Sequence, residues 1–425
     1  MLTKIKYDNY VAILKSELIQ ALGCTEPIAV AYAAAKAANV LGKMPQRVEM
    51  WCSGNIIKNV KGVTVPNTGN LKGVNAAAIA GILSGKSDAE LKVLEGMSEE
   101  NIAKIRELLN QDFCSTHLAE GVENLYIAAK AFAGDDSAEV CIQTTHTNII
   151  RIMKNNEVVF EKKDDTDEAG ADQGDKSLLN VKDILEFADT VALEDVRAIL
   201  ANQIKLNTAI SEEGLWHKYG VNVGRTLLQS YGYDVKTRAA AKAAAGSDAR
   251  MSGCSLPVVI NSGSGNQGIT VSLPVIEYAR ELDVSEEKLY RALVVSNLVA
   301  IHQKTGIGRL SAYCGAVSAA CGSGAAITYL CGGSYESVSK TITNTIANVG
   351  GIVCDGAKAS CAAKIAASVD AAILAHHISL NGNAFASGEG LVKDDIEQTI
   401  SSVARMGRKG MKGTDVEILK IMIDQ

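Results

Sequence analysis

The stretch Lys162-Lys-Asp-Asp-Thr-Asp-Glu-Ala-Gly-Ala-Asp-Gln-Gly-Asp-Lys176 divides this chain into two parts of different character. It is acidic, contains glycine and has no large apolar residue, a composition typical of a solvated linker or a long loop. Hydrophobic periodicity differs on its two sides. We therefore expect one domain over residues 1–178 and a second over residues 179–425.

Before this stretch, helical and strand periodicities are mixed. Apolar residues recur at helical spacing over Tyr10–Leu22, and Pro27 suits the first turn of a second, alanine-rich helix that runs to about Val40. Period-two alternation predicts strands at 48–52, 140–143, 149–153 and 158–161. Asn155-Asn156 is the predicted hairpin turn between the last two strands.

After Val181 almost every segment has helical periodicity, interrupted by glycine-rich loops at 261–268, 306–308 and 350–356. The sequence therefore predicts an α+β fold, with an N-terminal mixed α/β domain followed by a predominantly helical C-terminal domain.

Composition limits the class of protein. The chain has 425 residues, of which 47% are hydrophobic and 21% are charged, so it is expected to be globular. A net charge of −6 and the lack of a Lys/Arg-rich run argue against a nucleic-acid partner. Residues 310–335 carry no charge, but Ala, Gly, Ser and Cys dominate them, which favours a buried helix over a membrane span.

The compartment is predicted from the start of the chain and from its cysteines. The first eight residues have no apolar core of the length that a signal peptide needs. Ten scattered cysteines without an export signal indicate reduced thiols rather than a disulfide framework. We expect a cytoplasmic protein, a homodimer, that binds a small molecule and neither nucleic acid nor membrane.

The cysteines of the C-terminal half are the candidate metal ligands, because thiolates favour zinc or iron–sulfur clusters. Cys314 and Cys321 form one pair seven residues apart, and Cys354 and Cys361 form another. Seven residues of helix separate two thiols by about 10 Å, too far for one small cluster. Asp355-Gly356 breaks the second pair, so Cys354 and Cys361 are the better pair. Cys314 and Cys321 compete as the third ligand, with Cys331 behind them, and burial as small apolar residues is the alternative for all of them.

Six segments in chain order resemble a known family: Ala21-Leu-Gly-Cys-Thr-Glu-Pro27, Val65-Pro-Asn-Thr-Gly69, His146-Thr-Asn148, Ser247-Asp-Ala-Arg250, Asn261-Ser-Gly-Ser-Gly-Asn-Gln-Gly268 and Cys354-Asp-Gly-Ala357. They resemble the L-cysteine desulfidase family, a relative of the iron–sulfur L-serine dehydratase alpha chain. The resemblance implies that Cys314, Cys354 and Cys361 hold a [4Fe–4S] cluster with one iron open to substrate. It also implies conversion of L-cysteine to pyruvate, ammonia and sulfide, with L-serine as the alternative substrate.

The resemblance implies a catalytic role for Cys24. This thiol is expected to act as the base that removes the Cα proton, if a helix N-terminus or a cation lowers its pKa, or as a fourth ligand in the resting enzyme. The glycine-rich loop at 261–268 is a candidate cradle for the substrate carboxylate, and a tight turn is its structural alternative. Candidate substrate contacts are the polar residues of these motifs: Asn67, Thr68, His146, Arg250, Ser262, Ser264 and Asn266.

Two other classes of protein stay open at this point. A pyridoxal-phosphate lyase catalyses the same overall reaction, but no particular lysine is marked in this sequence. A non-catalytic zinc protein would use four closed ligands, such as Cys314, Cys321, Cys354 and Cys361. The colour and metal content of the purified protein separate these three classes.

Overall fold

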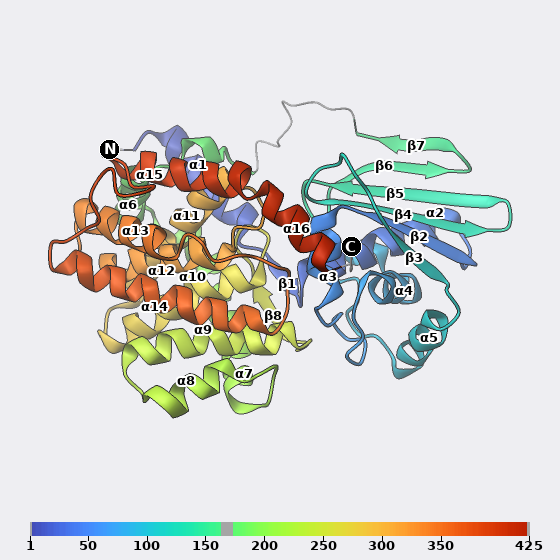
Figure 1. Cartoon of the computed structure of the whole chain (residues 1–425), viewed down its shortest axis with the longest axis horizontal. Helices are drawn as coiled ribbons and strands as arrows, with labels where there is room; N and C mark the ends of the chain where they lie inside the picture. The colour runs from blue at the N-terminus through green and yellow to red at the C-terminus, as the bar shows by residue number, and fades with distance from the viewer. Residues whose placement is uncertain (1, 163–172, 423–425) are drawn as a thin grey trace.

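The computed structural model describes residues 2–162 and 173–422. Most of the acidic stretch predicted as a linker, residues 163–172, lies outside the described residues, so that expectation stays a prediction. The described parts are a helical body and a sheet-containing body that lie side by side (Figure 1). This is the α+β architecture that the sequence predicts, with a mixed sheet in the N-terminal half and a helical C-terminal region.

A six-stranded sheet organises the N-terminal half, in the strand order β3-β2-β4-β5-β6-β7. Only β2 and β3 pair in parallel, and the other neighbours are antiparallel. The strands are β2 (Arg47–Cys52), β3 (Cys114–Leu118), β4 (Tyr126–Ala133), β5 (Asp136–Gln143), β6 (Ile149–Lys154) and β7 (Glu157–Glu161). Helices α2 (Thr25–Leu41) and α4 (Val74–Ser84) pack against one face of this sheet.

The strands expected from period-two alternation are confirmed. Val48, Met50 and Cys52 of β2 are buried, as the alternation requires. Asn155 and Asn156 both have positive φ, at 49° and 67°, which suits the tight turn between β6 and β7. Strands β3 and β4 were not expected from the sequence.

The helix predicted over Tyr10–Leu22 is only partly right. Helix α1 covers Lys4–Glu17, and residues 20–22 form strand β1 instead. Strand β1 pairs antiparallel with β8 (Pro257–Val259), so its backbone groups find partners in another segment rather than in a helical turn. The second predicted helix is confirmed as α2, with Pro27 in its first turn.

The C-terminal half is almost wholly helical. Its helices are α6 (Val181–Thr190), α7 (Leu193–Trp216), α8 (Val223–Tyr231), α9 (Val235–Met251), α10 (Gly265–Glu281), α11 (Glu286–Ile307), α12 (Gly315–Leu330), α13 (Tyr335–Val349), α14 (Ser360–Leu380), α15 (Ile396–Arg405) and α16 (Lys412–Met422). The remaining helical elements are α3 (Gly54–Lys61), α5 (Glu99–Leu109), η1 (Ser87–Lys92), η2 (Lys176–Leu178) and η3 (Met406–Gly410).

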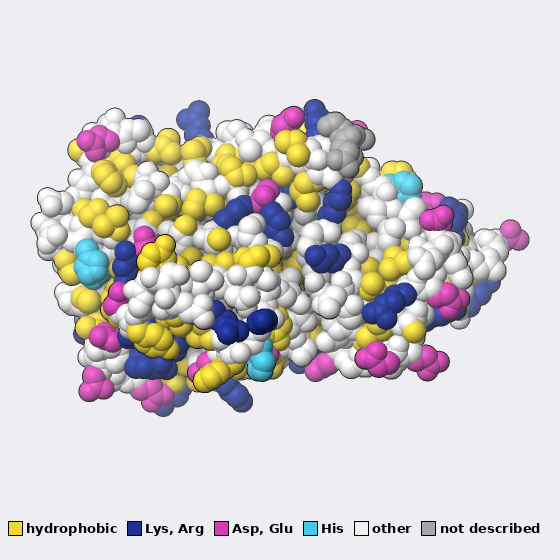
Figure 2. Space-filling model, turned by 60° about the horizontal axis from the view of Figure 1, so that its bottom comes forward, with side chains coloured by type: hydrophobic (Ala, Val, Ile, Leu, Met, Phe, Trp, Pro, Cys, Tyr) yellow, Lys and Arg dark blue, Asp and Glu magenta, His cyan; other side chains and the backbone are white. Residues whose placement is uncertain are grey.

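The uncharged stretch at 310–335 contains α12, which is buried among α10, α11, α13 and α14. This confirms the buried helix that its composition predicts. Among the described residues one helix, α14, is long and apolar enough to cross a membrane, but more than half of its most apolar window is buried, and a core helix passes the same test. On the face shown in Figure 2, apolar side chains are scattered among charged and polar ones.

Each terminal helix of the described chain packs against the other half: α1 contacts the helical body, and α16 contacts α3 of the N-terminal half. Helix α1 packs on α7 of the helical body, and the rings of Tyr10 and Phe187 meet edge-to-face at 5.3 Å. Helix α16 lies against α3, where the two bodies meet (Figure 1). The predicted division at residues 178 and 179 stays a prediction, but α1 and β1 pack in space with the second part of the chain.

Candidate active site

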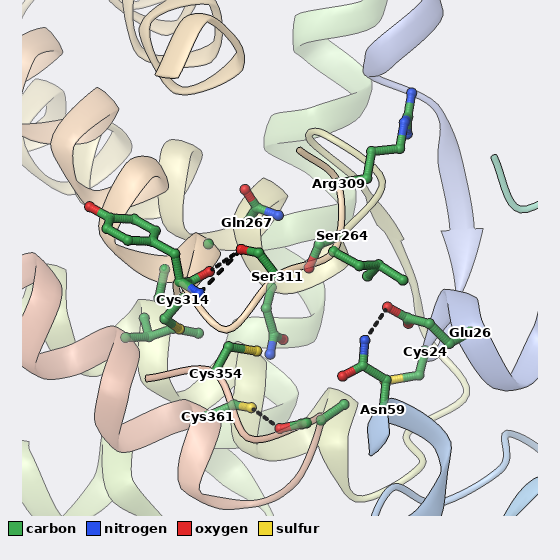
Figure 3. A pocket seen from close by; sticks show the side chains of 18 of the residues that line it. Cys24, Glu26, Asn59, Ser264, Gln267, Arg309, Ser311, Cys314, Cys354 and Cys361 are labelled. Carbon is green, nitrogen blue, oxygen red and sulfur yellow. Dashed lines mark hydrogen bonds between the residues drawn. The ribbon is translucent and has the colours of Figure 1, made fainter. Parts of the chain in front are cut away.

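A pocket of about 100 Å³ lies where the two bodies meet. The N-terminal half contributes Cys24, Glu26 and Asn59 to its lining, and the helical half contributes Cys314, Cys354 and Cys361. Figure 3 shows these side chains projecting from separate elements toward one space. The volume accommodates several water molecules, and therefore a small substrate.

Two loops hold Cys314 and Cys354 side by side. Cys314 precedes the first turn of α12 as its N-cap residue. Its backbone N–H donates to the carbonyl of Ile352 at 3.1 Å, and the N–H of Cys354 donates to the carbonyl of Ala312 at 2.7 Å. These reciprocal bonds form a short antiparallel bridge that aligns the two cysteines although forty residues separate them.

A non-helical turn brings Cys361 to the same pocket. Gly356 has φ of +96°, and a Cβ atom there would lie 2.3 Å from the carbonyl oxygen of Lys58, so both its conformation and its surroundings require glycine. Helix α14 begins only at Ser360, and the Cys361 thiol donates to the carbonyl of Gly356 at 3.7 Å (Figure 3). The predicted break between Cys354 and Cys361 is confirmed.

Cys321 and Cys331 are not part of the pocket lining. Cys321 lies two turns inside α12, fully buried, with its thiol directed at the carbonyl of Ile342 at 3.8 Å. Cys331 is exposed at the end of that helix. Of the competing third ligands, the structure therefore brings Cys314 to Cys354 and Cys361. The four-cysteine zinc site is not assembled, because Cys321 points elsewhere.

The electrostatics of the pocket favour a thiolate at Cys354. A hydrogen bond from the Cys314 thiol lowers the pKa of Cys354 and raises that of Cys314, and Lys58 and Lys304 lower the pKa of Cys354 further. Burial raises the pKa of Cys361. Lys304 lines the pocket with 4% of its surface exposed, and burial lowers the pKa of its ammonium group to about 8, against the opposing effect of Cys354 and Cys314.

The donor set fits an iron–sulfur cluster in its chemistry. Three soft sulfur donors line one pocket, beside buried cations that stabilise thiolates. Among the described residues, no three His, Cys, Asp or Glu side chains are grouped closely enough to hold a single metal ion. A four-iron cube gives each cysteine its own iron atom, so its ligands lie farther apart than those of one ion.

Cys24 lines the same pocket as Cys314, Cys354 and Cys361 and is the N-cap residue of α2. It is 1% exposed, and burial raises the pKa of its thiol to about 12, although Arg250 acts to lower it. We expected a lowered pKa for Cys24 as a base, and in the chain without a bound group its pKa is raised instead. The helix N-terminus and the nearby cation that the expectation required are both present.

Three of the predicted substrate contacts line the pocket: Arg250, Ser264 and Asn266. The Arg250 guanidinium donates from Nε to the carbonyl of Gly23 at 3.0 Å and from Nη1 to Oδ1 of Asn266 at 3.2 Å. Ser264 is the N-cap residue of α10. These bonds fix Arg250 between the motif around Cys24 and the glycine-rich loop.

The other predicted contacts do not line this pocket. Thr68 is buried and donates to the carbonyl of Val65 within its own loop, and Asn67 donates to the carbonyl of Leu94 and so joins that loop to a neighbouring segment. Ser262 borders a neighbouring cavity instead and donates to Oδ1 of Asn261.

His146 is buried beside Gly263, close to Arg309. Burial lowers the pKa of its imidazole to about 4, so the ring is neutral at pH 7, and its Nε2 has no hydrogen-bond partner.

Further polar residues of the pocket were missed from the sequence: Glu26, Asn59, Gln267, Lys304, Arg309 and Ser311. Glu26 and Gln267 belong to the motifs quoted above, so their position was a usable signal. Asn59 and Lys304 lie in ordinary helical runs that carry no such signal.

The fold and the site define an α+β protein with a thiol-rich pocket built by both halves of the chain. A family model described as the serine dehydratase alpha chain matches residues 88–420. The chain belongs to the serine dehydratase alpha chain family, which points to a dehydratase-type lyase.

Full-length relatives support the same relationship. A UPF0597 protein of Lachnoclostridium phytofermentans is 56% identical over 98% of this chain and 100% of its own length. A UPF0597 protein of Desulfitobacterium hafniense is 53% identical over 99% and 97%, and one of Treponema denticola is 49% identical over 99% of both chains. The names of these relatives state no activity.

Proposed function

We propose that this chain is an iron–sulfur-dependent β-eliminating lyase that converts L-cysteine to pyruvate, ammonia and hydrogen sulfide. The observation that carries the proposal is the meeting of Cys314, Cys354 and Cys361 in one pocket with Cys24 on its other side. The family relationship supports the lyase class. The resemblance of the motifs supports cysteine as the substrate.

Cys314, Cys354 and Cys361 would hold the [4Fe–4S] cluster. When bound, a cluster with one iron free of protein thiolate supplies a Lewis acid that polarises the leaving group at Cβ. The chain itself supplies the stabilisation of the ligand thiolates, because Lys58 and Lys304 lower the pKa of Cys354.

The elimination also requires that a proton leave Cα. Cys24 lines the pocket that would hold the substrate, and Arg250 is the cation that acts to lower its pKa. We keep two roles for this thiol: the base, once the pocket is filled and its pKa has fallen, or a ligand that closes the pocket in the resting protein. Arg250, Ser264 and Asn266 bind and orient the substrate, because they line the same space.

L-serine is the second candidate substrate, and the description of the matching family favours it. Cysteine and serine differ at one atom, and thiolate leaves more readily than hydroxide. A site that hydrogen-bonds a serine hydroxyl rejects cysteine strongly, whereas an apolar surrounding discriminates poorly. We propose the higher kcat/KM for L-cysteine.

Anaerobic reconstitution tests this proposal. We expect a brown protein with about four iron and four sulfide per chain that releases sulfide from L-cysteine with a higher kcat/KM than it forms pyruvate from L-serine. A preference for L-serine would make the protein a dehydratase. A colourless protein with stoichiometric zinc, or a yellow one bleached by borohydride, would refute the iron–sulfur assignment.

The remaining expectations belong to the same proposal. The substrate is a small amino acid, and the ten free cysteines suit a reducing, cytoplasmic location. A homodimer without nucleic-acid or membrane partners is proposed, and sedimentation of the purified protein measures its mass.

A further inference from the structure

The pocket contains one carboxylate among its described lining residues, that of Glu26. Glu26 lies in the first turn of α2, at the positive end of the helix dipole. It is 9% exposed, and its oxygens accept hydrogen bonds only from neutral groups: Oε1 from Asn59 Nδ2 at 3.2 Å, and Oε2 from Thr25 Oγ1 at 3.0 Å. Within the described chain no Lys, Arg or His forms a salt bridge with it. A buried carboxylate without a cation is costly, which indicates that the cation comes from a ligand.

Asn59 provides a second, independent observation. A carboxylate only accepts hydrogen bonds, so the Asn59 atom next to Glu26 must be the donor Nδ2. This contact fixes the orientation of the amide and directs Oδ1 to the opposite side. The Oδ1 atom is buried and has no hydrogen-bond partner. Figure 3 shows it directed into the pocket, toward the side from which Cys354 and Cys361 project. An unsatisfied acceptor therefore stands beside an unpaired carboxylate at one end of the pocket.

We propose that Glu26 and Asn59 form the subsite that binds the ammonium group of an α-amino acid. An ammonium group has three donors and no acceptor, so it satisfies both side chains and neutralises Glu26. Lys304 and Arg250 line the same pocket as cations and suit the carboxylate of that amino acid. The subsite selects amino acids against acids that lack the amino group, and this assignment rests on the proposed function.

Two probes test the subsite without turnover. L-alanine has both the ammonium and the carboxylate group but no leaving group at Cβ, and 3-mercaptopropionate has the thiol and the carboxylate but no ammonium group. We expect Glu26→Gln to weaken the binding of L-alanine, measured by anaerobic calorimetry on reconstituted protein, by at least about tenfold, which corresponds to about 1.4 kcal/mol. Binding of 3-mercaptopropionate is expected to change less than about twofold, since a ligand without the ammonium group does not use the charge.

A second variant and a control complete the design. Asn59→Ala removes a neutral acceptor and is expected to weaken L-alanine by about two- to tenfold, less than Glu26→Gln. Glu139→Gln alters a largely buried carboxylate on β5, outside the pocket, and should leave both affinities unchanged.

Equal weakening of both probes, or no change with either, would overturn the subsite. So would a loss of turnover in Glu26→Gln with L-alanine binding intact, because Glu26 would then act in the chemistry. If wild-type protein binds L-alanine through Glu26 but acts on neither L-cysteine nor L-serine, the subsite stands and the proposed function falls.

Discussion

The Nζ atom of Lys58 donates a hydrogen bond to the backbone carbonyl of Cys354 at 3.3 Å. The same ammonium group pairs with Asp415 of α16, and Asn55 donates to that carboxylate at 2.8 Å. Lys58 is 1% exposed, and Asp415 is the carboxylate that pairs with its charge. The last helix of the chain thus holds the lysine that fixes the loop around Cys354.

Replacing Asp415 by Asn should therefore destabilise the chain. Removing one partner of a buried ion pair leaves the other charge uncompensated, and we expect the free energy of unfolding in urea to fall by about 3 kcal/mol. Glu107→Gln is the matched control, because its pair with Lys104 is exposed and its loss should leave the free energy of unfolding nearly unchanged. Equal losses in the two variants would show that Lys58 finds other compensation.

The cysteines make a second prediction. Replacing Cys314, Cys354 or Cys361 by Ser should abolish the visible absorption of the reconstituted protein, because each removes a thiolate from the proposed cluster. Cys321→Ser should retain the absorption, since that thiol is directed at Ile342 inside the helical body. Absorption spectra and iron content of the four variants measure this. If the absorption were lost in the Cys321 variant and kept in the Cys314 variant, the third ligand would be Cys321 and the assignment of Cys314 would be wrong.

Asp248 makes the stability of the chain depend on pH. It is fully buried on α9, and burial raises the pKa of its carboxyl to about 6, although the N–H of Gly224 donates to it. The folded chain therefore holds this proton more tightly than the unfolded chain, in which the pKa is 3.8. The resulting stabilisation is complete below about pH 3.8 and is lost as the pH rises through about 6.

Asp248→Asn does not titrate and isolates this effect. Between pH 4 and 6.5 the free energy of unfolding of the wild type, minus that of the variant, should fall by on the order of 1–3 kcal/mol. Urea unfolding of the cluster-free chain measures it, and other titrating groups such as His146 cancel in the difference. Two curves that run parallel across this range would contradict the prediction.

Gly265 makes the fourth prediction. A Cβ atom at this position would lie 2.3 Å from Nε of Arg250 and 2.7 Å from a methyl carbon of Val258. Gly265→Ala should displace Arg250 from the carbonyl of Gly23 and cost about 1–3 kcal/mol of stability. Gly413→Ala in α16 meets no atom within 4 Å and should be neutral or stabilising by up to about 1 kcal/mol. Thermal unfolding compares them, and equal midpoints would refute the packing argument.

The sequence predicted the elements whose apolar residues follow a clear period. The alternation in β2 and the paired asparagines between β6 and β7 reflect local physics, and both are confirmed. Residues 20–22 follow helical spacing as well, but pairing with β8 decides their structure. That partner lies more than two hundred residues away, so no local pattern reveals it.

The site shows the same limit. The break at Asp355-Gly356 was predicted because a glycine turn is a local feature. The choice between Cys314 and Cys321 depends on the bridge from Cys314 to the loop around Cys354, which is a tertiary contact. Asn59 reaches the pocket because α3 packs near α2, and no pattern in its own segment marks it as a pocket residue.

The pocket takes Cys24 from the beginning of the chain and Cys361 from near its end. A ribosome that adds about 5–20 residues per second needs tens of seconds to make the intervening chain. Strand β8 and Arg250 are made before that time has passed, but the pocket lacks Cys361 until its end. The complete pocket, and any group bound by residues from both halves of it, can therefore form only after Cys361 has been synthesised.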